Sequence, residues 1–300
     1  MENLHMIKDF SCWIEYKGFS EGSGRSEKVW LTNSDNTETV LFKFNKAETT
    51  TEHISEAIAS DIASVLGISS AKVEIGSYNK RIGCASYLIN ENGEDLIEGV
   101  RLINKFYPYY DQEILYDSEN EMYYSLEMIL EALSLYEFKN EFFKIMIFDF
   151  IIGNTDRHQN NWAILSKNGI NRLCPVYDNG SSLCSYIKDD DVNNYLGKDR
   201  VRFRALVNSK SKSRIKIDCK KSKEPTHLEV FSYIYSKFHD EVHEFVDKTI
   251  EILTNSKIDE ILNRYNNSEL VSDKKRLLIS LFLKHKINLL KYEVDSWKEE

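Results

Sequence analysis

The stretch GNTDRHQNNWAIL, residues 153–165, follows the most apolar run of the chain, FFKIMIFDFII at 142–152. The spacing of apolar residues predicts a helix over 138–152, which the polar stretch then ends. Residues 162–165 have the composition of a short strand, the Asn-Gly of SKNG is typical of a turn, and residues 170–176 fit a returning strand. The sequence therefore predicts a β-hairpin shortly after an apolar helix.

Two oxygen-bearing side chains flank this predicted hairpin. Asn161 enters it and Asp178 leaves it, seventeen positions later, so the closed hairpin brings them to one place. An amide and a carboxylate oxygen suit Mg²⁺ that is otherwise held by water and phosphates. Asp156, five residues before Asn161, is placed to accept a hydroxyl proton or to orient a nucleophile. Any one of the three fits an ordinary cap or turn, but their joint spacing favours a catalytic site.

The other charged residues of the loop have a simpler interpretation. His158 invites a catalytic role, yet a loop histidine more often bonds to the backbone and keeps the loop in shape. We therefore expect Arg157 and His158 to be structural residues of the loop.

The first ninety residues consist of strand-like pieces around one helix, in the order β-β-β-α-β-β. The helix TTEHISEAIASDIASVLG, residues 50–67, has apolar residues at helical spacing and a terminal glycine. The predicted strands are FSCWIEY, VWL, TVLFKF, AKVEIG and the stretch from Cys84 to Ile89. This order predicts a small sheet with one helix.

Two features of this region point to a phosphate-binding function. Lys43 lies inside the apolar strand TVLFKF, where an ammonium is costly without an anionic partner. The next helix offers Glu52 and Glu56, and a strand lysine held by a helix glutamate presents its charge to nucleotide phosphates. Glu56, nearer the helix centre, is the expected partner. Gly22 and Gly24 allow the backbone to approach a phosphate, although for this pair alone a plain hairpin turn is the simpler interpretation.

Composition sets the domain organisation and excludes several protein classes. The 300 residues are 42% hydrophobic, enough for an α+β fold with a sheet lobe at 1–90 and a helical lobe at 91–300. Helical patterns at 121–136 and from about 226 to the end support the second lobe. The net charge of -9 argues against a general nucleic-acid or membrane binder, and the sequence offers no run long and apolar enough for a membrane span. Five cysteines without a C-x-x-C pair or a secretory signal indicate reduced thiols in the cytoplasm.

One segment departs from the acidic average. Residues 197–225 contain eleven Lys or Arg against three acidic residues. The pattern fits a solvated, mobile loop and fits equally a docking surface for an acidic protein or an RNA.

The quoted motifs resemble one known family. FDFIIGNTDRHQNNW followed by PVYDNGSS is similar to the HipA-like serine/threonine kinases, in particular the short HipA-like and CtkA-type members, over roughly residues 20–185. The resemblance implies a bilobal protein-kinase-like fold that uses ATP and Mg²⁺. It implies Asp156 as catalytic base, Asn161 and Asp178 as Mg²⁺ ligands, and Lys43 held by Glu56 at the phosphates. The remaining implied ATP-binding residues are Gly22, Ser23, Gly24, Tyr87, Leu88 and Asn90.

The resemblance also implies a regulation and a substrate class. In this family a serine of the glycine loop can be autophosphorylated, which places negative charge where the ATP phosphates must sit, and Ser23 and Ser26 are the candidates. The expected acceptor is a protein serine or threonine. Toxin-type activity and an antitoxin-like partner are further expectations, although docking to a DNA-binding antitoxin does not carry over to a chain that enters the kinase core almost at once. The alternatives are a lipid or small-molecule kinase and a non-catalytic pseudokinase.

Overall fold

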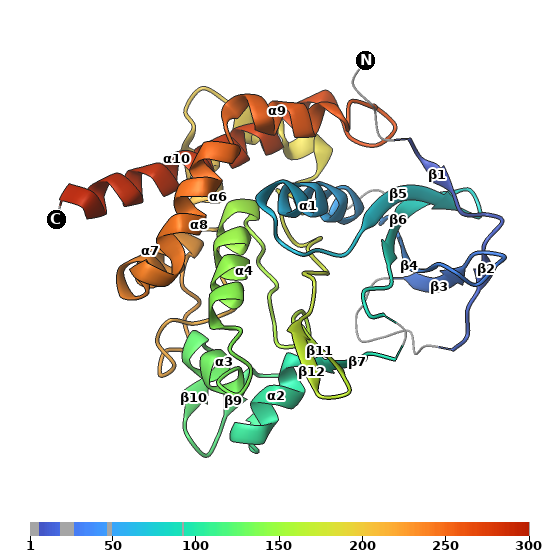
Figure 1. The fold of residues 1–300 in the computed structure, drawn as a ribbon. Helices are drawn as coiled ribbons and strands as arrows, with labels where there is room; N and C mark the ends of the chain where they lie inside the picture. The colour runs from blue at the N-terminus through green and yellow to red at the C-terminus, as the bar shows by residue number, and fades with distance from the viewer. Residues whose placement is uncertain (1–5, 19–26, 47–49, 92, 300) are drawn as a thin grey trace.

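The computed structural model describes residues 6–18, 27–46, 50–91 and 93–299, and places a small curved sheet beside a larger helical part (Figure 1). The sheet has six strands in the order β1-β5-β6-β4-β3-β2, where β1 runs parallel to β5 and the other neighbours are antiparallel. Its strands are β1 (Lys8–Asp9), β2 (Ile14–Glu15), β3 (Lys28–Thr32), β4 (Thr39–Phe44), β5 (Val73–Tyr78) and β6 (Arg81–Tyr87). The α+β class expected from the sequence is confirmed.

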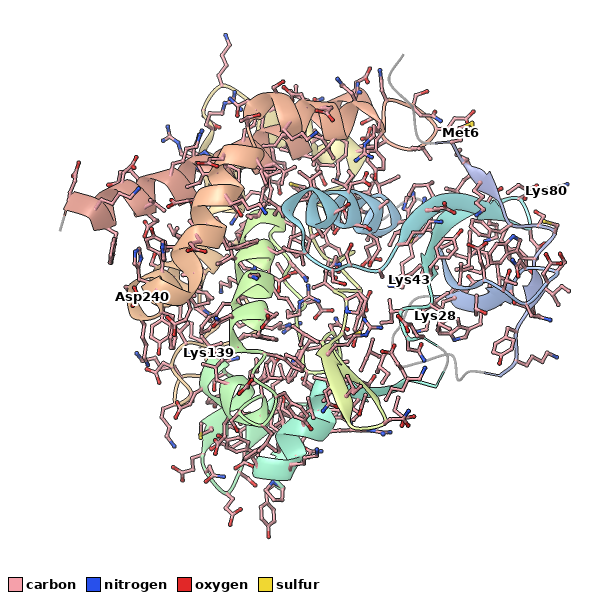
Figure 2. The ribbon with its side chains drawn as sticks, viewed as in Figure 1. Met6, Lys28, Lys43, Lys80, Lys139 and Asp240 are labelled. Carbon is pink, nitrogen blue, oxygen red and sulfur yellow. The ribbon has the colours of Figure 1, made fainter. Side chains whose placement is uncertain are left out.

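The pleat of β4 decides where its lysine points. Val40 and Phe42 are buried in an aromatic cluster on one face of the sheet. Successive side chains alternate between the two faces, so Lys43 projects to the other face. The strand register places Lys43 opposite Cys84 of β6, and Cys84 belongs to the main core. Lys43 therefore points away from the aromatic cluster (Figure 2).

The helix α1 (Glu52–Leu66) joins the sheet to the helical part (Figure 1). It ends at Gly67, whose positive φ of 69° suits a residue without a Cβ. Its apolar residues belong to the same continuous core as those of the large lobe. On its polar side Asp61 accepts a hydrogen bond of 2.6 Å from the Tyr265 hydroxyl and pairs with Arg264 at 2.8 Å. The helix is thus fixed from both sides.

The centre of the large lobe is α4 (Lys139–Ile152), which is buried on nearly all sides from Phe142 onward. A helix that is apolar all round must be covered by other elements. The other helices are α2 (Gly99–Phe106), α3 (Leu126–Ala132), the short 3₁₀ turn η1 (Asp189–Asp191), α5 (Asn193–Leu196), α6 (Val201–Val207), α7 (His227–Lys237), α8 (His239–Ile252), α9 (Asn255–Asn263) and α10 (Asp273–Glu299).

The predicted hairpin is present as β11 (Ala163–Lys167) and β12 (Ile170–Leu173). A third strand, β7 (Asp95–Glu98), pairs with the other side of β11 and extends the hairpin into a three-stranded sheet. A second small sheet is formed by β8 (Tyr110–Asp111), β9 (Tyr116–Asp117) and β10 (Met122–Tyr123). The sequence-based hairpin is therefore confirmed and is part of a larger sheet.

Two expected elements were wrong in their extent. The helix expected over 121–136 is shorter, because Met122–Tyr123 pairs as β10 with β9 and the helix α3 begins only at Leu126. FSCWIEY does not form one strand, since a turn at residues 11–13 separates β1 from β2. The division into lobes at residue 90 stays a prediction. Over the described ranges, no helix has both the length and the apolar character that a bilayer span requires.

Candidate active site

Arg157 holds the loop after α4 in place. Its guanidinium is buried and pairs with Asp149 near the end of α4, with Nη2 2.7 Å from Oδ1 and Nε 2.9 Å from Oδ2. The same group donates to the backbone carbonyls of Asn161 at 2.8 Å and Tyr177 at 3.1 Å, and to Asn179 Oδ1 at 2.7 Å. One side chain therefore connects the helix, the start of the hairpin and the segment after it.

Asp156 is positioned by its neighbours in the same loop. The helix α4 ends at Gly153, which has a positive φ of 66°, and the chain turns into the loop there. Asn154 Oδ1 accepts from the backbone N–H of Asp156 at 3.0 Å, and Asn161 Nδ2 donates to the Asp156 carbonyl at 2.8 Å. The Asp156 carboxylate stays partly exposed, with 39% of its side chain accessible. Its backbone is thus fixed while its carboxylate faces open space.

The charges around Asp156 oppose one another. Burial raises the pKa of its carboxyl, and the nearby His158 and Arg214 lower that pKa, with a net rise. Arg214 Nε lies 3.4 Å from Asp156 Oδ1. His158 Nδ1 accepts from the backbone N–H of Asn160 at 3.2 Å, which is the backbone bonding expected of a loop-shaping residue. A carboxyl with a raised pKa is a better proton acceptor than an ordinary one.

Figure 2 shows Lys43 where the small sheet faces the helical part, and two carboxylates lie close to its ammonium. Lys43 Nζ lies 2.7 Å from Asp178 Oδ1 and 3.7 Å from Glu56 Oε2. Glu56 Oε1 in turn accepts from the backbone N–H of Asn179 at 3.0 Å. The other candidate, Glu52, pairs instead with Lys46 at 3.5 Å. Of the two glutamates that the sequence offered, Glu56 is thus the one beside Lys43.

Burial and pairing act on these groups in opposite directions. Burial lowers the pKa of Lys43, but the carboxylates of Asp178 and Glu56 outweigh it, so the pKa lies above its ordinary value. The Lys43 charge holds the pKa of Asp178 below its usual range, whereas burial raises the pKa of Glu56. Lys43 is therefore a permanent cation at physiological pH, and Asp178 is an anion beside it.

A cavity of about 1030 Å³ collects these groups. Lys43, Glu56, Asp156, Asn161 and Asp178 all line it. Its size matches that of small-molecule and cofactor sites. The described part of the chain has no cluster of three or more His, Cys, Asp or Glu side chains able to hold a metal. The half-exposed Asp178 carboxylate and the Asn161 amide fit Mg²⁺, which keeps several water or phosphate ligands.

Some predicted nucleotide-binding residues lie elsewhere or outside the described ranges. Gly22, Ser23, Gly24 and Ser26 fall outside the residues that the structure describes. The Tyr87 hydroxyl donates to Glu74 at 2.5 Å, and the backbone N–H groups of Tyr87 and Leu88 already bond within the sheet. Asn90 Nδ2 donates to the Glu94 carbonyl at 3.3 Å. A contact between residues 87–90 and adenine stays a prediction.

A buried polar chain behind the loop escaped the sequence interpretation. His227 Nε2 bonds the Asn154 carbonyl at 2.8 Å, its Nδ1 lies 2.9 Å from Ser211 Oγ, and Lys286 Nζ donates to the same hydroxyl at 2.8 Å. Burial lowers the pKa of Lys286 to about 7 and that of His227 to about 3. None of these three residues carries a local sequence signal; the neighbouring Asp149 does, because a carboxylate inside an apolar helix needs a buried partner.

Sequence comparison relates this chain to known proteins. A model of the HipA-like C-terminal domain matches residues 20–256. The serine/threonine-protein kinase CtkA of Helicobacter pylori is 24% identical over 192 residues, which cover 59% of this chain and 54% of that protein. The chain thus spans about half the length of this curated relative.

One solved structure superimposes well on this chain. The crystal structure of the H. pylori proinflammatory kinase CtkA superimposes with a TM-score of 0.79 at 19% identity, over 96% of this chain and 98% of that one. The structure of HipA from Shewanella oneidensis in complex with HipB and operator DNA gives a TM-score of 0.49 at 14% identity. The match covers 84% of this chain and 58% of that one. Because the family match covers more than half of the sequence, the chain belongs to the HipA-like C-terminal domain family.

Proposed function

We propose that this protein is an ATP- and Mg²⁺-dependent serine/threonine protein kinase. The observation that carries the proposal is the cavity in which the cation of Lys43, the oxygens of Asn161 and Asp178, and the carboxylate of Asp156 meet. A permanent cation, a hard-metal ligand pair and a proton acceptor are the parts that phosphoryl transfer requires. The H. pylori relative is named as a serine/threonine kinase, which supports a protein acceptor.

Each residue has a distinct task in the proposed reaction. Lys43, held by Glu56, binds phosphate oxygens of ATP. Asp156 orients the acceptor hydroxyl and takes its proton while the hydroxyl oxygen forms a bond to the γ-phosphorus. The bond from the γ-phosphorus to the β–γ bridging oxygen breaks, and ADP leaves with that electron pair. Arg157, through its contacts with Asp149 and the hairpin, keeps Asp156 in place.

Asn161 and Asp178 are the proposed metal ligands. A bound Mg²⁺ would neutralise the developing phosphate charge. The Asp178 carboxylate lines the cavity and already pairs with a cation, the Lys43 ammonium at 2.7 Å, which supports a role in binding a metal cation there. Asn161 precedes the first strand of the hairpin and Asp178 follows the second, so their approach depends on the hairpin, whose start Arg157 binds through the Asn161 carbonyl.

The direct test is transfer of labelled phosphate from ATP. We expect the wild type to label itself or an added polypeptide mixture, Asp156→Ala to lose transfer while still binding ATP, and Asp178→Ala to bind Mg-ATP more weakly. A fold check by circular dichroism accompanies both variants. Labelling of lipid extracts alone would support the alternative lipid kinase, and equal inactivity of the wild type and Asp156→Ala toward ATP would support a pseudokinase.

Two finer proposals follow from the family. Autophosphorylation at Ser23 or Ser26 would block ATP electrostatically, and mass spectrometry of the ATP-treated protein tests it. Toxin-type activity in the cytoplasm, with an antitoxin-like partner, is tested by growth after induced expression of the wild type and of Asp156→Ala. Growth arrest with the wild type alone would support it, and no arrest with either would contradict it.

A further inference from the structure

The basic segment 197–225 is packed and ordered where it passes the candidate active site. Ser211, Ser213 and Ile215 are buried. The backbone of this stretch is bonded on both sides, with Ser213 N–H to the Pro225 carbonyl at 2.9 Å and Leu126 N–H to the Lys216 carbonyl at 2.9 Å. The stretch is therefore a fixed wall, which can present side chains at defined positions.

Arg214 is the residue of this wall that lines the cavity. Its Nε lies 3.4 Å from Asp156 Oδ1, and its Nη1 donates to Glu224 Oε1 at 3.0 Å. Nε is buried and has no hydrogen-bond partner among the described residues. An arginine offers five N–H donors in a planar fork, and this one uses few of them. The guanidinium has capacity for one more anionic group beside the catalytic carboxylate.

The position of Arg214 favours the acceptor side over the nucleotide side. Lys43 Nζ lies 2.7 Å from Asp178 Oδ1, whereas Arg214 Nε lies 3.4 Å from Asp156 Oδ1. The nucleotide end therefore has its own cation in Lys43. The acceptor hydroxyl must approach Asp156, so the residues flanking that hydroxyl pass close to Arg214.

The surrounding charge agrees with an acidic partner. The segment 197–225 has eleven basic against three acidic residues, while the whole chain carries a net charge of -9. The negative net charge of the whole chain disfavours an acidic peptide, whereas the excess of basic residues in this segment attracts one. A peptide that also presents a hydroxyl to Asp156 is favoured over an RNA.

We propose that Arg214 gives this kinase a preference for serines or threonines that lie next to an aspartate or glutamate, whose carboxylate binds the Arg214 guanidinium. The inference rests on the proposed kinase function and names its substrate class. A bidentate arginine–carboxylate pair adds geometric specificity as well as attraction, so only one or two flanking positions should show the effect. A hydrogen bond to a charged group corresponds to a preference of roughly tenfold to a hundredfold.

The test compares peptides that differ by one charge. A serine peptide carries aspartate at each flanking position in turn, and its partner carries asparagine there. We expect the wild type to show at least a roughly tenfold higher kcat/KM for the aspartate peptide at one position. Arg214→Gln should bring the ratio of the two kcat/KM values to about one, and Arg214→Lys should retain part of it. The matched control is Arg202→Gln, an exposed arginine of the same segment, which should keep the wild-type ratio.

The ratio separates this role from others. If Arg214→Gln lowers kcat/KM equally for both peptides, Arg214 acts on the phosphate or on Asp156 and the proposal is overturned. A wild type that phosphorylates peptides without any charge preference overturns it too, while the kinase function stands. If the wild type transfers no phosphate to protein or peptide, both the proposed kinase function and the proposed substrate preference are refuted.

A binding measurement gives a readout without turnover. Peptides with alanine in place of the acceptor serine are labelled, and their affinity is measured by fluorescence anisotropy in the presence of Mg-ADP. Tighter binding of the aspartate peptide by the wild type and not by Arg214→Gln supports the inference. Displacement of the peptide by single-stranded RNA at a lower concentration than by unlabelled peptide would favour an RNA ligand and overturn it.

Discussion

Replacement of Arg157 by methionine should destabilise the protein strongly. The guanidinium is 1% exposed and its partner Asp149 is 5% exposed, and Arg157 makes five hydrogen bonds of 2.7–3.1 Å. Methionine fills a similar volume but removes the cation. Asp149 then keeps the Asn154 amide at 3.1 Å as a partner and loses its counter-charge.

The expected cost follows from the uncompensated charge. Breaking a buried ion pair by removal of one partner costs about 3–5 kcal/mol. For a chain of this size this corresponds to a fall of roughly 6–20 °C in Tm. Urea unfolding followed by tryptophan fluorescence measures the free energy of unfolding, and thermal unfolding gives Tm. A second variant, Asp149→Leu with Arg157→Met, should recover much of the loss, because no unpaired charge remains.

The control is an ion pair of similar geometry at the surface. Arg81 binds both oxygens of Glu27 at 2.6 and 2.8 Å, and the two side chains are 50% and 64% exposed. Arg81→Met should cost much less stability than Arg157→Met, because water screens an exposed pair and solvates the carboxylate that is left. If Arg157→Met proves no more destabilising than Arg81→Met, the buried pair does not hold the loop and the reasoning is refuted.

Three further outcomes are expected. Asp178→Asn should raise the Mg²⁺ concentration for half-maximal ATP turnover by about tenfold or more, measured by coupled ADP release, since a neutral ligand replaces an ionised one. Lys286 and Lys275 have pKa values lowered by burial to about 7 and about 8, so stability should rise as pH increases from about 7 toward 10.5, where the unfolded lysine still binds its proton. Lys286→Met should reduce that rise in urea titrations, and an unchanged slope would contradict the assignment. Iodoacetamide at pH 8 should label the exposed Cys12 before Cys84, whose pKa burial raises to about 12, and peptide mass spectrometry gives the order.

The parts of the site that the sequence predicted rest on local patterns. Strand alternation marked Lys43, helix position marked Glu56, and the hairpin joined Asn161 to Asp178. Each of these inferences depends on the residues of a single strand, helix or hairpin and on no contact between distant segments. All these residues line one cavity, and their chemical roles stay proposals.

The parts that the sequence missed depend on contacts between distant segments. The stretch 121–136 has helical spacing, but pairing with β9 takes Met122–Tyr123 into a strand, and tertiary context overrides propensity. Likewise the link from Lys286 through Ser211 and His227 to the loop after α4 joins α10, the basic segment and α7. No spacing rule reveals a chain of three residues so far apart.

The basic segment shows why charge density alone cannot decide between a mobile loop and a surface. KSKSRIKI, residues 210–217, alternates cations with small or apolar residues, which is the period of an extended chain with one buried side. That alternation was visible, but the positions of Tyr124 and Pro225, which bond its backbone, were not. Lys216 is itself buried beside the Tyr123 ring. Burial thus removes part of the positive charge of this segment from the surface, whereas Arg214 lines the cavity and lies 3.4 Å from Asp156. The binding properties of the segment therefore depend on which cations remain accessible at the cavity and not on how many the sequence contains.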